Sequence, residues 1–286
     1  MATDQERTGP PLEPDHVLQI DDERFDPSRA ALVTGAASGI GRATALAFAM
    51  NGATVVGTDF DQEGLAETAR KAEEWGIGDR LETVVGDLRR KDDLDGLAET
   101  ADEAGALTFL ANIAGLQHID PIESFPDDQY DRIQQVMLRA PVLLAKRTMP
   151  HLRASGGGVI GNMASAHGHY VTADKVAYNV VKFGIRGLTQ SIAAEYESNG
   201  GVRSFSVSTG YVSTPLVMDQ IPDTAAQRGI TEREVIEDVM LGQSRVKRMM
   251  SPIEVANLFV FGSSRHAAHL NGGDLLFDGG MTLTYQ

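Results

Sequence analysis

Short apolar runs rich in β-branched residues alternate with longer segments of helical periodicity along most of the chain. The apolar runs predict strands, because they are short and are bounded by glycine and aspartate turns. These runs are AALVTG (30–35), ATVVGTD (53–59), LETVVGD (81–87), ALTFLANIAG (106–115), GGVIGNMAS (157–165), VRSFSVST (202–209) and GDLLFDGG (273–280). The segments between them predict helices that begin near Ile40, Gln62, Lys91, Asp127, Thr172 and Pro252. The alternation predicts an α/β fold: a single-domain, doubly wound parallel sheet of about seven strands with helices on both faces.

Two parts of the chain fall outside this alternation. Residues 1–28 are rich in proline and acidic residues and poor in aromatics. This composition predicts a flexible or surface-draped arm rather than a packed element, so the fold is expected to occupy 29–286. After the sixth strand, an irregular stretch around 213–246 is predicted to contain further helices. Because open α/β folds bind ligands beyond the carboxyl ends of their strands, we predict that this stretch forms a substrate lid.

Composition and charge mainly exclude classes of partner. The chain carries 40 acidic and 25 basic residues, a formal net charge of −15, so we expect neither nucleic acid nor an anionic membrane as a partner. We interpret the acid excess as a solvated surface, with adaptation to a salt-rich habitat as the alternative. Cysteine is absent and the seven histidines lack metal-site spacing, so no metal is expected. No run resembles a membrane span or a signal peptide, which predicts a soluble cytoplasmic protein.

The first predicted strand ends in the glycine-rich sequence TGAASGIGRA, which leads directly into a helix. Gly35, Gly39 and Gly41 let the backbone turn tightly against a pyrophosphate, whose charge the helix N-terminus favours. Asp59 ends the second strand, and no arginine follows it directly. Its carboxylate could accept hydrogen bonds from a ribose diol and would repel a 2′-phosphate, which favours NAD over NADP in a Rossmann-type site. In the alternative interpretation, Asp59 only caps the next helix.

Two further strand ends point to the same cofactor site. Asp87 is placed to meet an adenine ring, and the segment from Asn112 to Gly115 is placed to close beside the ribose. Each could also be an ordinary strand-terminating turn. Their occurrence at successive strand ends favours the cofactor interpretation.

The segment ASAHGHYVTADKVAYNVVK (164–182) carries the candidate chemistry. Tyr178 and Lys182 are four residues apart, so on a helix they share a face. A phenol has a pKa of about 10, and a close ammonium is expected to lower it. Ser165 ends the preceding strand and can donate a hydrogen bond to the oxygen that exchanges a proton with Tyr178. Most YxxxK pairs on helices are solvated surface pairs; the serine at the strand end favours a site.

Together these segments resemble the short-chain dehydrogenase/reductase family from about Arg29 onward. The resemblance rests on TGAASGIG, Asp59, NIAG, Ser165 and YNVVK, and SPIEVANLFVFGSS and NGGDLLFDGG are similar to that family's last helix and strand. Within the family, AGLQHIDPIESFP, ASAHG, DKVAYNVVK and GYVSTPLVMDQIP are similar to bacterial D-3-hydroxybutyrate dehydrogenases. The resemblance implies an NAD-dependent homotetramer that moves hydride between nicotinamide and a small 3-hydroxy acid, with 3-hydroxybutyrate and acetoacetate as the pair.

The resemblance also implies roles for individual residues. Ser165, Tyr178 and Lys182 would be catalytic, with Lys182 also holding the cofactor ribose. The cofactor-binding set would be Gly35, Ser38, Gly39, Ile40, Gly41, Asp59, Asp87, Leu88, Asn112, Ala114, Gly115, Tyr178, Lys182, Gly210, Val212 and Thr214. The substrate-binding set would be Gln117, Ser165, His167, Lys175, Tyr178, Tyr211 and Gln220, of which four would hold a carboxylate. The four carboxylate candidates are Gln117, His167, Lys175 and Gln220. Taken singly, they could be a loop amide, a turn histidine, a surface lysine and a helix cap, respectively. His118, His169 and Tyr170 are expected to be loop or rim residues.

The chain departs from the family pattern at Met137. The family carries an asparagine there, whose amide helps a bound water connect the active-site lysine to solvent, and a thioether is at best a weak acceptor. Ile113, Thr209 and the pair Phe261–Gly262 are further departures. We therefore hypothesise an enzyme that is slower or uses another water path. The alternatives are a relative acting on another alcohol, ketone or acyl thioester, and an NAD-binding regulatory protein with little turnover.

Overall fold

A seven-stranded parallel sheet forms the centre of the molecule, with the strand order β3-β2-β1-β4-β5-β6-β7. The computed structural model describes residues 8–196 and 201–284. The strands are β1 (Arg29–Thr34), β2 (Thr54–Asp59), β3 (Leu81–Val85), β4 (Ala106–Asn112), β5 (Gly158–Met163), β6 (Val202–Thr209) and β7 (Asp274–Phe277). The strand order reverses direction between β1 and β4, and this is where an open α/β sheet leaves a crevice for a ligand.

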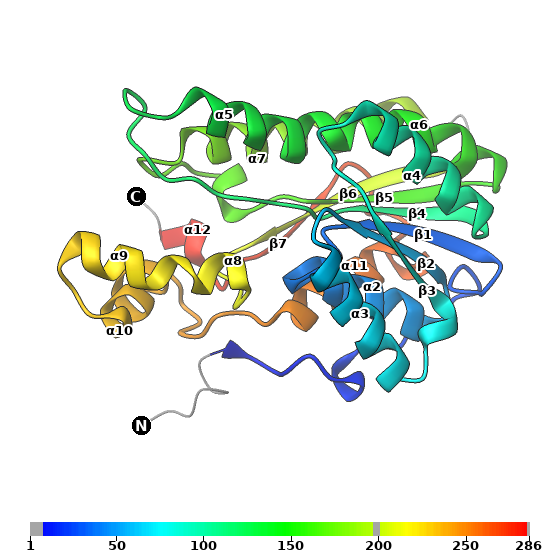
Figure 1. The fold of residues 1–286 in the computed structure, drawn as a ribbon, viewed down its shortest axis with the longest axis horizontal. Coiled ribbons are helices and arrows are strands. Elements are labelled where there is room, and N and C mark those ends of the chain that lie inside the picture. Colours follow the sequence, from blue (N-terminus) through cyan, green and yellow to red (C-terminus); the bar gives the residue numbers. More distant parts are fainter. Residues whose placement is uncertain (1–7, 197–200, 285–286) are drawn as a thin grey trace.

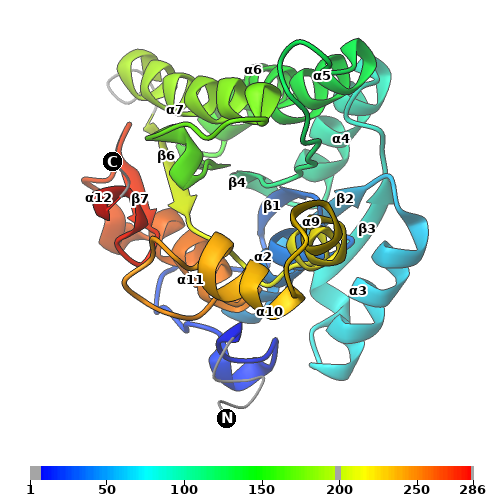
Figure 2. The ribbon, with the colours of Figure 1, turned by 90° about the vertical axis from the view of Figure 1, so that its left-hand side faces the viewer.

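Helices cover both faces of the sheet (Figures 1 and 2). One face carries α2 (Gly39–Asn51), α3 (Gln62–Glu74) and α11 (Pro252–Ser263). The other carries α4 (Lys91–Glu103), α5 (Asp127–Gln134), a π-helical turn η3 (Gln135–Arg139), α6 (Ala140–Ala154) and α7 (Val176–Tyr196). Short 3-10 turns are η1 (Pro14–His16), η2 (Gly78–Arg80), η4 (Ala166–Gly168) and η7 (Arg265–Ala267). The predicted fold class is confirmed. Every helix within the described residues is too short or too polar to cross a membrane.

The core has one apolar layer on each side of the sheet, which explains the nearly continuous apolar strands. Adjacent residues of β1 and β4 point to opposite layers: Val33 and Phe109 pack with α2 and α11, whereas Leu32 and Leu110 pack with α4 and α6. Both layers exclude water, since all four side chains are at most 1% exposed. A strand buried on both faces has no polar face to alternate with.

The first turn of α7 differs from the sequence-based expectation. The helix begins at Val176 rather than near Thr172. Asp174 adopts a left-handed backbone with φ 65°, which is incompatible with a continuing helix. Lys175 therefore precedes the helix. Its three-residue distance from Tyr178 does not by itself put the two side chains on one helical face.

Part of the N-terminal arm belongs to the packed fold, which corrects the expectation of an arm without packed side chains. Phe25 is 6% exposed and stacks on Phe109, with ring centroids 4.8 Å apart. Upstream, the arm lies along α2 and α11: the side-chain amide of Asn257 donates to the carbonyl of His16, and its oxygen accepts from the amide N–H of Leu18. The arm was misjudged because its partners lie far along the chain.

The stretch after β6 contains several short helices, as expected. They are α8 (Pro215–Met218), α9 (Gln220–Arg228), α10 (Glu232–Glu234) and the π-helical turn η6 (Val235–Met240), and α12 (Met281–Thr284) follows β7. A small separate core of Ile221, Val235, Met240 and Met249 holds this region together. Figure 1 shows α9 and α10 projecting beyond the sheet, beside the carboxyl ends of its strands. Its role as a substrate lid stays a prediction.

Candidate active site

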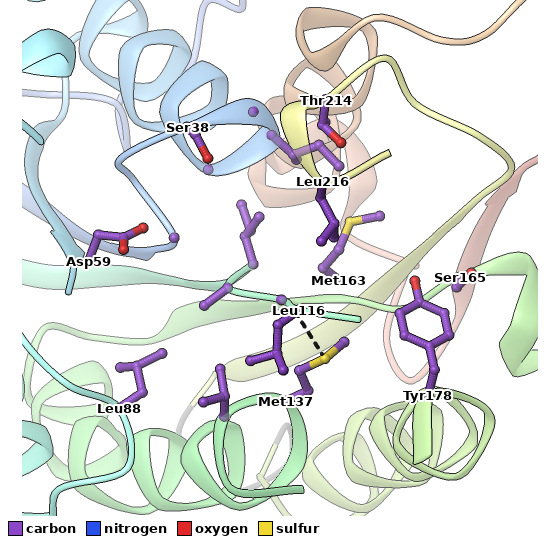
Figure 3. Close-up of a pocket in the computed structure, with 18 of the residues that line it drawn as sticks. Ser38, Asp59, Leu88, Leu116, Met137, Met163, Ser165, Tyr178, Thr214 and Leu216 are labelled. Atoms are coloured by element: carbon purple, nitrogen blue, oxygen red, sulfur yellow. Dashed lines mark hydrogen bonds between the residues drawn. The ribbon is translucent and has the colours of Figure 1, made fainter. Parts of the chain in front are cut away.

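A pocket of about 370 Å³ lies at the carboxyl ends of the strands, which is large enough for a cofactor-sized ligand. Figure 3 shows Ser38 and Asp59 on one side and Ser165 and Tyr178 on the other. The predicted residues that line it are Gly35, Ser38, Gly39, Ile40, Gly41, Asp59, Asp87, Leu88, Ala114, Gly115, Ser165, Tyr178, Lys182, Gly210, Val212 and Thr214. Most of the predicted cofactor and catalytic residues therefore share one cavity.

The loop between β1 and α2 is shaped to receive an anion. A Cβ at Gly41 would lie 2.0 Å from the carbonyl oxygen of Gly35, and a Cβ at Gly35 would lie 2.9 Å from Cα of Ala114. Only glycine fits this close approach of backbone to backbone. Ser38 occupies the N-cap of α2, yet within the described chain its hydroxyl makes no capping bond, so it is free to meet a ligand. The residues present fit a pyrophosphate.

Asp59 is held at the edge of this loop by main-chain donors. Its two carboxylate oxygens accept from the N–H groups of Ala37 and Asp61, each at 3.2 Å. The guanidinium of nearby Arg42 is directed beneath the loop, where it donates to Thr68 Oγ1 at 2.9 Å and to the carbonyl of Gly64. The Asp59 side chain lines the pocket and forms no ion pair with any residue of the described ranges 8–196 and 201–284.

Asp87 and Asn112, which follow or end strands, have different surroundings, and neither matches the expectation fully. Asp87 lines the pocket, but Arg89 binds both of its carboxylate oxygens, and this hydrogen bonding lowers the pKa of Asp87. Asn112 lies below the pocket, where its amide donates to Asn162 Oδ1 at 2.9 Å. The structure therefore brings Asp87 to the cofactor site as an ion pair and leaves Asn112 inside the sheet.

The three candidate catalytic residues converge at the other side of the pocket. Ser165 follows β5 and caps η4, where its Oγ accepts from the N–H of His167 at 3.2 Å. Lys182 is 4% exposed, and its Nζ donates to the carbonyl of Met163 at 2.7 Å. That Nζ lies 5.3 Å from the ring centroid of Tyr178. Serine hydroxyl, phenol and ammonium thus share one corner of the cavity.

The ionisation of this corner is controlled by burial. Burial raises the pKa of the Tyr178 phenol, and the hydrogen bond with Ser165 opposes that rise. Burial lowers the pKa of Lys182 to about 7. The pKa of Tyr178 is thus raised and not lowered as expected, because burial of the phenol outweighs the hydrogen bond that opposes the rise.

Of the other predicted substrate residues, His167 packs directly against Tyr178, whereas Lys175 and Tyr211 lie near each other. The ring of His167 packs against the Tyr178 ring at 5.7 Å, edge to face, and His167 Nε2 lies 3.0 Å from Thr172 Oγ1. Burial, followed by the charges of Lys175 and Lys182, lowers the pKa of His167 to about 3, so its imidazole is neutral near pH 7. Lys175 Nζ lies 5.9 Å from the Tyr211 ring. Tyr211 lines a neighbouring cavity of about 200 Å³.

Gln117 and Gln220 are not brought into the main cavity. Gln220 is half-exposed, and its side-chain amide donates to the carbonyl of Leu216 one turn earlier. Gln117 follows Leu116, which lines the pocket, and is half-buried. Carboxylate binding by these two amides stays a prediction.

Some residues that line the pocket were not expected from the sequence. They include Phe60, Arg89, Leu116, Arg132, Val136, Met163, Ala164, Thr209, Leu216 and Val217. Met163 and Thr209 end strands, and that position was a usable signal. Arg132 and Val136 belong to α5 and η3, whose approach to the pocket depends on packing between distant segments.

Comparison with known proteins agrees with this geometry. A family model described as enoyl-(acyl carrier protein) reductase matches residues 35–282. The chain belongs to the short-chain dehydrogenase/reductase family, whose dehydrogenases use nicotinamide cofactors, and it is an oxidoreductase of that family. A D-beta-hydroxybutyrate dehydrogenase of Rhizobium meliloti is 38% identical over 259 residues, which cover 89% of this chain and 99% of that protein. A second one, of Cupriavidus necator, is 33% identical and covers 88% of this chain and 97% of its own length. The crystal structure of levodione reductase superimposes with a TM-score of 0.84 at 27% identity, covering 91% of this chain and all of that one.

Met137 lies in the π-helical turn η3 and lines the pocket. Its Sδ accepts the N–H of Leu116 at 3.4 Å, which Figure 3 shows as a dashed line. The thioether and Lys182 line the same pocket. The thioether holds the loop after β4 but supplies no donor.

Replacing Met137 with asparagine is expected to raise kcat by about 2- to 10-fold, a small part of what positioned proton transfer contributes. The amide would give a water chain one donor and one acceptor on the path from Lys182 to solvent. Steady-state kinetics measures the change. Met137→Leu is the matched control, because it keeps the volume and adds no polar atom. An unchanged or lower kcat in folded Met137→Asn would contradict the hypothesis.

Proposed function

We propose that this protein is an NAD-dependent dehydrogenase of a small 3-hydroxy acid, with 3-hydroxybutyrate and acetoacetate as the substrate pair. One observation carries the proposal. Lys175 is half-buried near His167 and Tyr211, and desolvation, followed by the charge of Arg228 on α9, lowers its pKa to about 8. Two cations near each other beside a candidate acid/base group are stabilised by an anion, which a carboxylate substrate would supply.

The choice of NAD rests on Asp59. A carboxylate at this edge of the glycine loop accepts from a ribose diol and repels a 2′-phosphate. The bound nicotinamide would accept or supply the hydride. The Ser38 hydroxyl and the first N–H groups of α2 would hold the pyrophosphate, and Lys182 would hold the ribose.

The residues of the chain supply the proton chemistry. Ser165 is placed to donate a hydrogen bond to the substrate oxygen and so to orient it toward Tyr178. In alcohol oxidation, the phenolate of Tyr178 takes the hydroxyl proton, and in ketone reduction the phenol returns it. Lys182 and His167 pack around that phenol, and we assign the substrate carboxylate to Lys175, whose Nζ lies 5.9 Å from the centroid of the Tyr211 ring.

The direct test is reduction of NAD⁺, followed by absorbance, with each enantiomer of 3-hydroxybutyrate. Turnover with one enantiomer and weak turnover with NADP⁺ would support the proposal. Turnover only with other alcohols, or only of acyl thioesters, would replace the substrate. Tight NAD binding without turnover on any of these compounds would favour a regulatory protein.

Replacing Lys175 with alanine is expected to raise KM for 3-hydroxybutyrate by roughly 10- to 100-fold, the value of one hydrogen bond to a charged group. The value of kcat should change much less, because Lys175 binds a part of the substrate that does not react. A neutral alcohol such as 2-butanol is the control substrate, since it has no carboxylate to lose. Unchanged constants for 3-hydroxybutyrate would remove Lys175 from the carboxylate site.

We also propose that the protein assembles with copies of itself, as a tetramer by its family resemblance. The support lies on α6 and α7, where Val142, Val180 and Phe183 are 42–45% exposed. Apolar side chains of this size on neighbouring helices are typical of a surface that a partner covers.

A further inference from the structure

His169 joins the turn that follows Ser165 to the last strand of the sheet. Its Nε2 lies 2.8 Å from Asp274 Oδ2 and 3.3 Å from Ser208 Oγ. The side chains of His169 and Asp274 are only 21% and 12% exposed. His169 lies in a turn, as expected of a loop residue, but its half-buried ring contacts two strands rather than solvent alone.

Asp274 is a firm anchor for this contact. The hydroxyls of Ser206 and Ser208 both donate to its Oδ1, and both serines are almost fully buried. Asp274 is paired with Ser206 in the register of β6 and β7. A partly buried carboxylate in contact with three side chains is satisfied and has little freedom to move.

The turn between Ser165 and His169 is short and internally bonded. The N–H of Gly168 donates to the carbonyl of Ser165, and the N–H of His169 donates to the carbonyl of Ala166, each at 2.8 Å. A shift of His169 would therefore move the whole turn. That turn carries the Ser165 hydroxyl and the His167 ring, both of which contact Tyr178.

The turn has other attachments, one of which also reaches β6: the N–H of Ala164, next to Ser165, donates to the carbonyl of Val207 at 2.9 Å. Arg186 on α7 donates to the carbonyl of Gly168 at 2.6 Å, and the hydroxyl of Tyr170 donates to Met281 Sδ at 3.1 Å. His169 contacts β6, the strand whose carboxyl end carries the pocket residues Thr209 and Gly210. It thus ties the catalytic turn to the cofactor side of the pocket.

We propose that His169 and Asp274 are a positioning pair for the reaction. The pair holds the Ser165–His169 turn against β6 and β7, so that the serine hydroxyl and the His167 imidazole keep their places beside Tyr178. This inference rests on the proposed dehydrogenase function, because its consequence is a change in turnover. A misplacement of reacting groups by about 1 Å can cost about 10²-fold in rate.

The test compares His169→Leu with His169→Gln in the full-length protein. Leucine removes the hydrogen bonds, whereas the glutamine amide nitrogen can reach the position of Nε2. His169→Leu is expected to lower kcat by about 10-fold or more and to increase the deuterium isotope effect with a substrate deuterated at the carbinol carbon. KM for NAD should stay near the wild-type value. His169→Gln should recover most of kcat.

His151→Leu is the matched control. His151 makes a similar side-chain contact with Asp102, with Nδ1 and Oδ2 2.9 Å apart, between α6 and α4. Its loss should leave kcat and the isotope effect unchanged. If His169→Leu does not fold, His169→Asn replaces it, since its shorter amide cannot reach Asp274 as glutamine does.

The outcomes separate the two proposals. Wild-type inactivity toward 3-hydroxybutyrate would overturn the proposed substrate, and the pair would then be tested with whichever alcohol is oxidised. In an active protein, a wild-type kcat and isotope effect for His169→Leu would overturn the positioning role. Equal loss in His169→Leu and His169→Gln would overturn it as well.

Discussion

Replacing Tyr178 with phenylalanine is expected to lower kcat by about 10²- to 10⁴-fold, the range that a positioned acid or base contributes. Phenylalanine keeps the ring that packs against His167 and lies near Lys182. It removes the hydroxyl that bonds with Ser165 and, by our proposal, exchanges the substrate proton. Because burial raises the pKa of this phenol, the wild-type group stays protonated near neutral pH and is ready to donate in ketone reduction.

The measurement is acetoacetate reduction together with titration of NADH fluorescence, which reports cofactor binding without turnover. We expect NADH to bind the Tyr178→Phe variant nearly as well as the wild type. Tyr130→Phe is the matched control, because Tyr130 lies on α5 and is 37% exposed. A Tyr178→Phe kcat within 10-fold of wild type would exclude this residue as the main acid/base group.

Replacing Asp59 with serine is expected to lower kcat/KM for NAD by roughly 10- to 100-fold, as expected when hydrogen bonds to a charged group are lost. The same change should raise kcat/KM for NADP, because it removes the anion that would face a 2′-phosphate. The ratio of the two constants is the quantity to measure, since a general loss of stability would lower both.

Glu63→Gln is the control for this change of coenzyme preference. Glu63 lies in the first turn of α3, so its replacement removes a carboxylate near Asp59 without altering a pocket residue. Its coenzyme ratio should equal that of the wild type. An unchanged ratio in Asp59→Ser would mean that another residue selects the cofactor.

The strands and the glycine loop were predictable because their causes are local. A strand such as β4, buried on both faces, shows itself as an apolar run whatever packs against it. The backbone at Gly35 and Gly41 leaves no room for a side chain. Only glycine fits there, so the sequence itself reveals the loop. The four-residue spacing of Tyr178 and Lys182 likewise needs only a helix, and α7 provides it.

Other features depend on partners that are distant in the sequence. Phe25 belongs to the core because it meets Phe48 and Phe109, and the composition around it is that of a surface arm. His169 meets Asp274, which is 105 residues away. Arg132 and Val136 reach the pocket because α5 and η3 pack beside it. No local pattern distinguishes such residues from exposed ones.

The sequence by itself determined the order of strands and helices, the anion loop and the identities of the serine, tyrosine and lysine, because each depends on a few neighbouring residues. Tertiary structure alone decided the ionisation of the site. Lys182 has a pKa of about 7 and His167 a pKa of about 3 because packing removes water from them, and that packing comes from segments across the whole chain. Tertiary structure also decided which residues contact and position the catalytic ones. Desolvation and long-range hydrogen bonds are properties of the assembled fold.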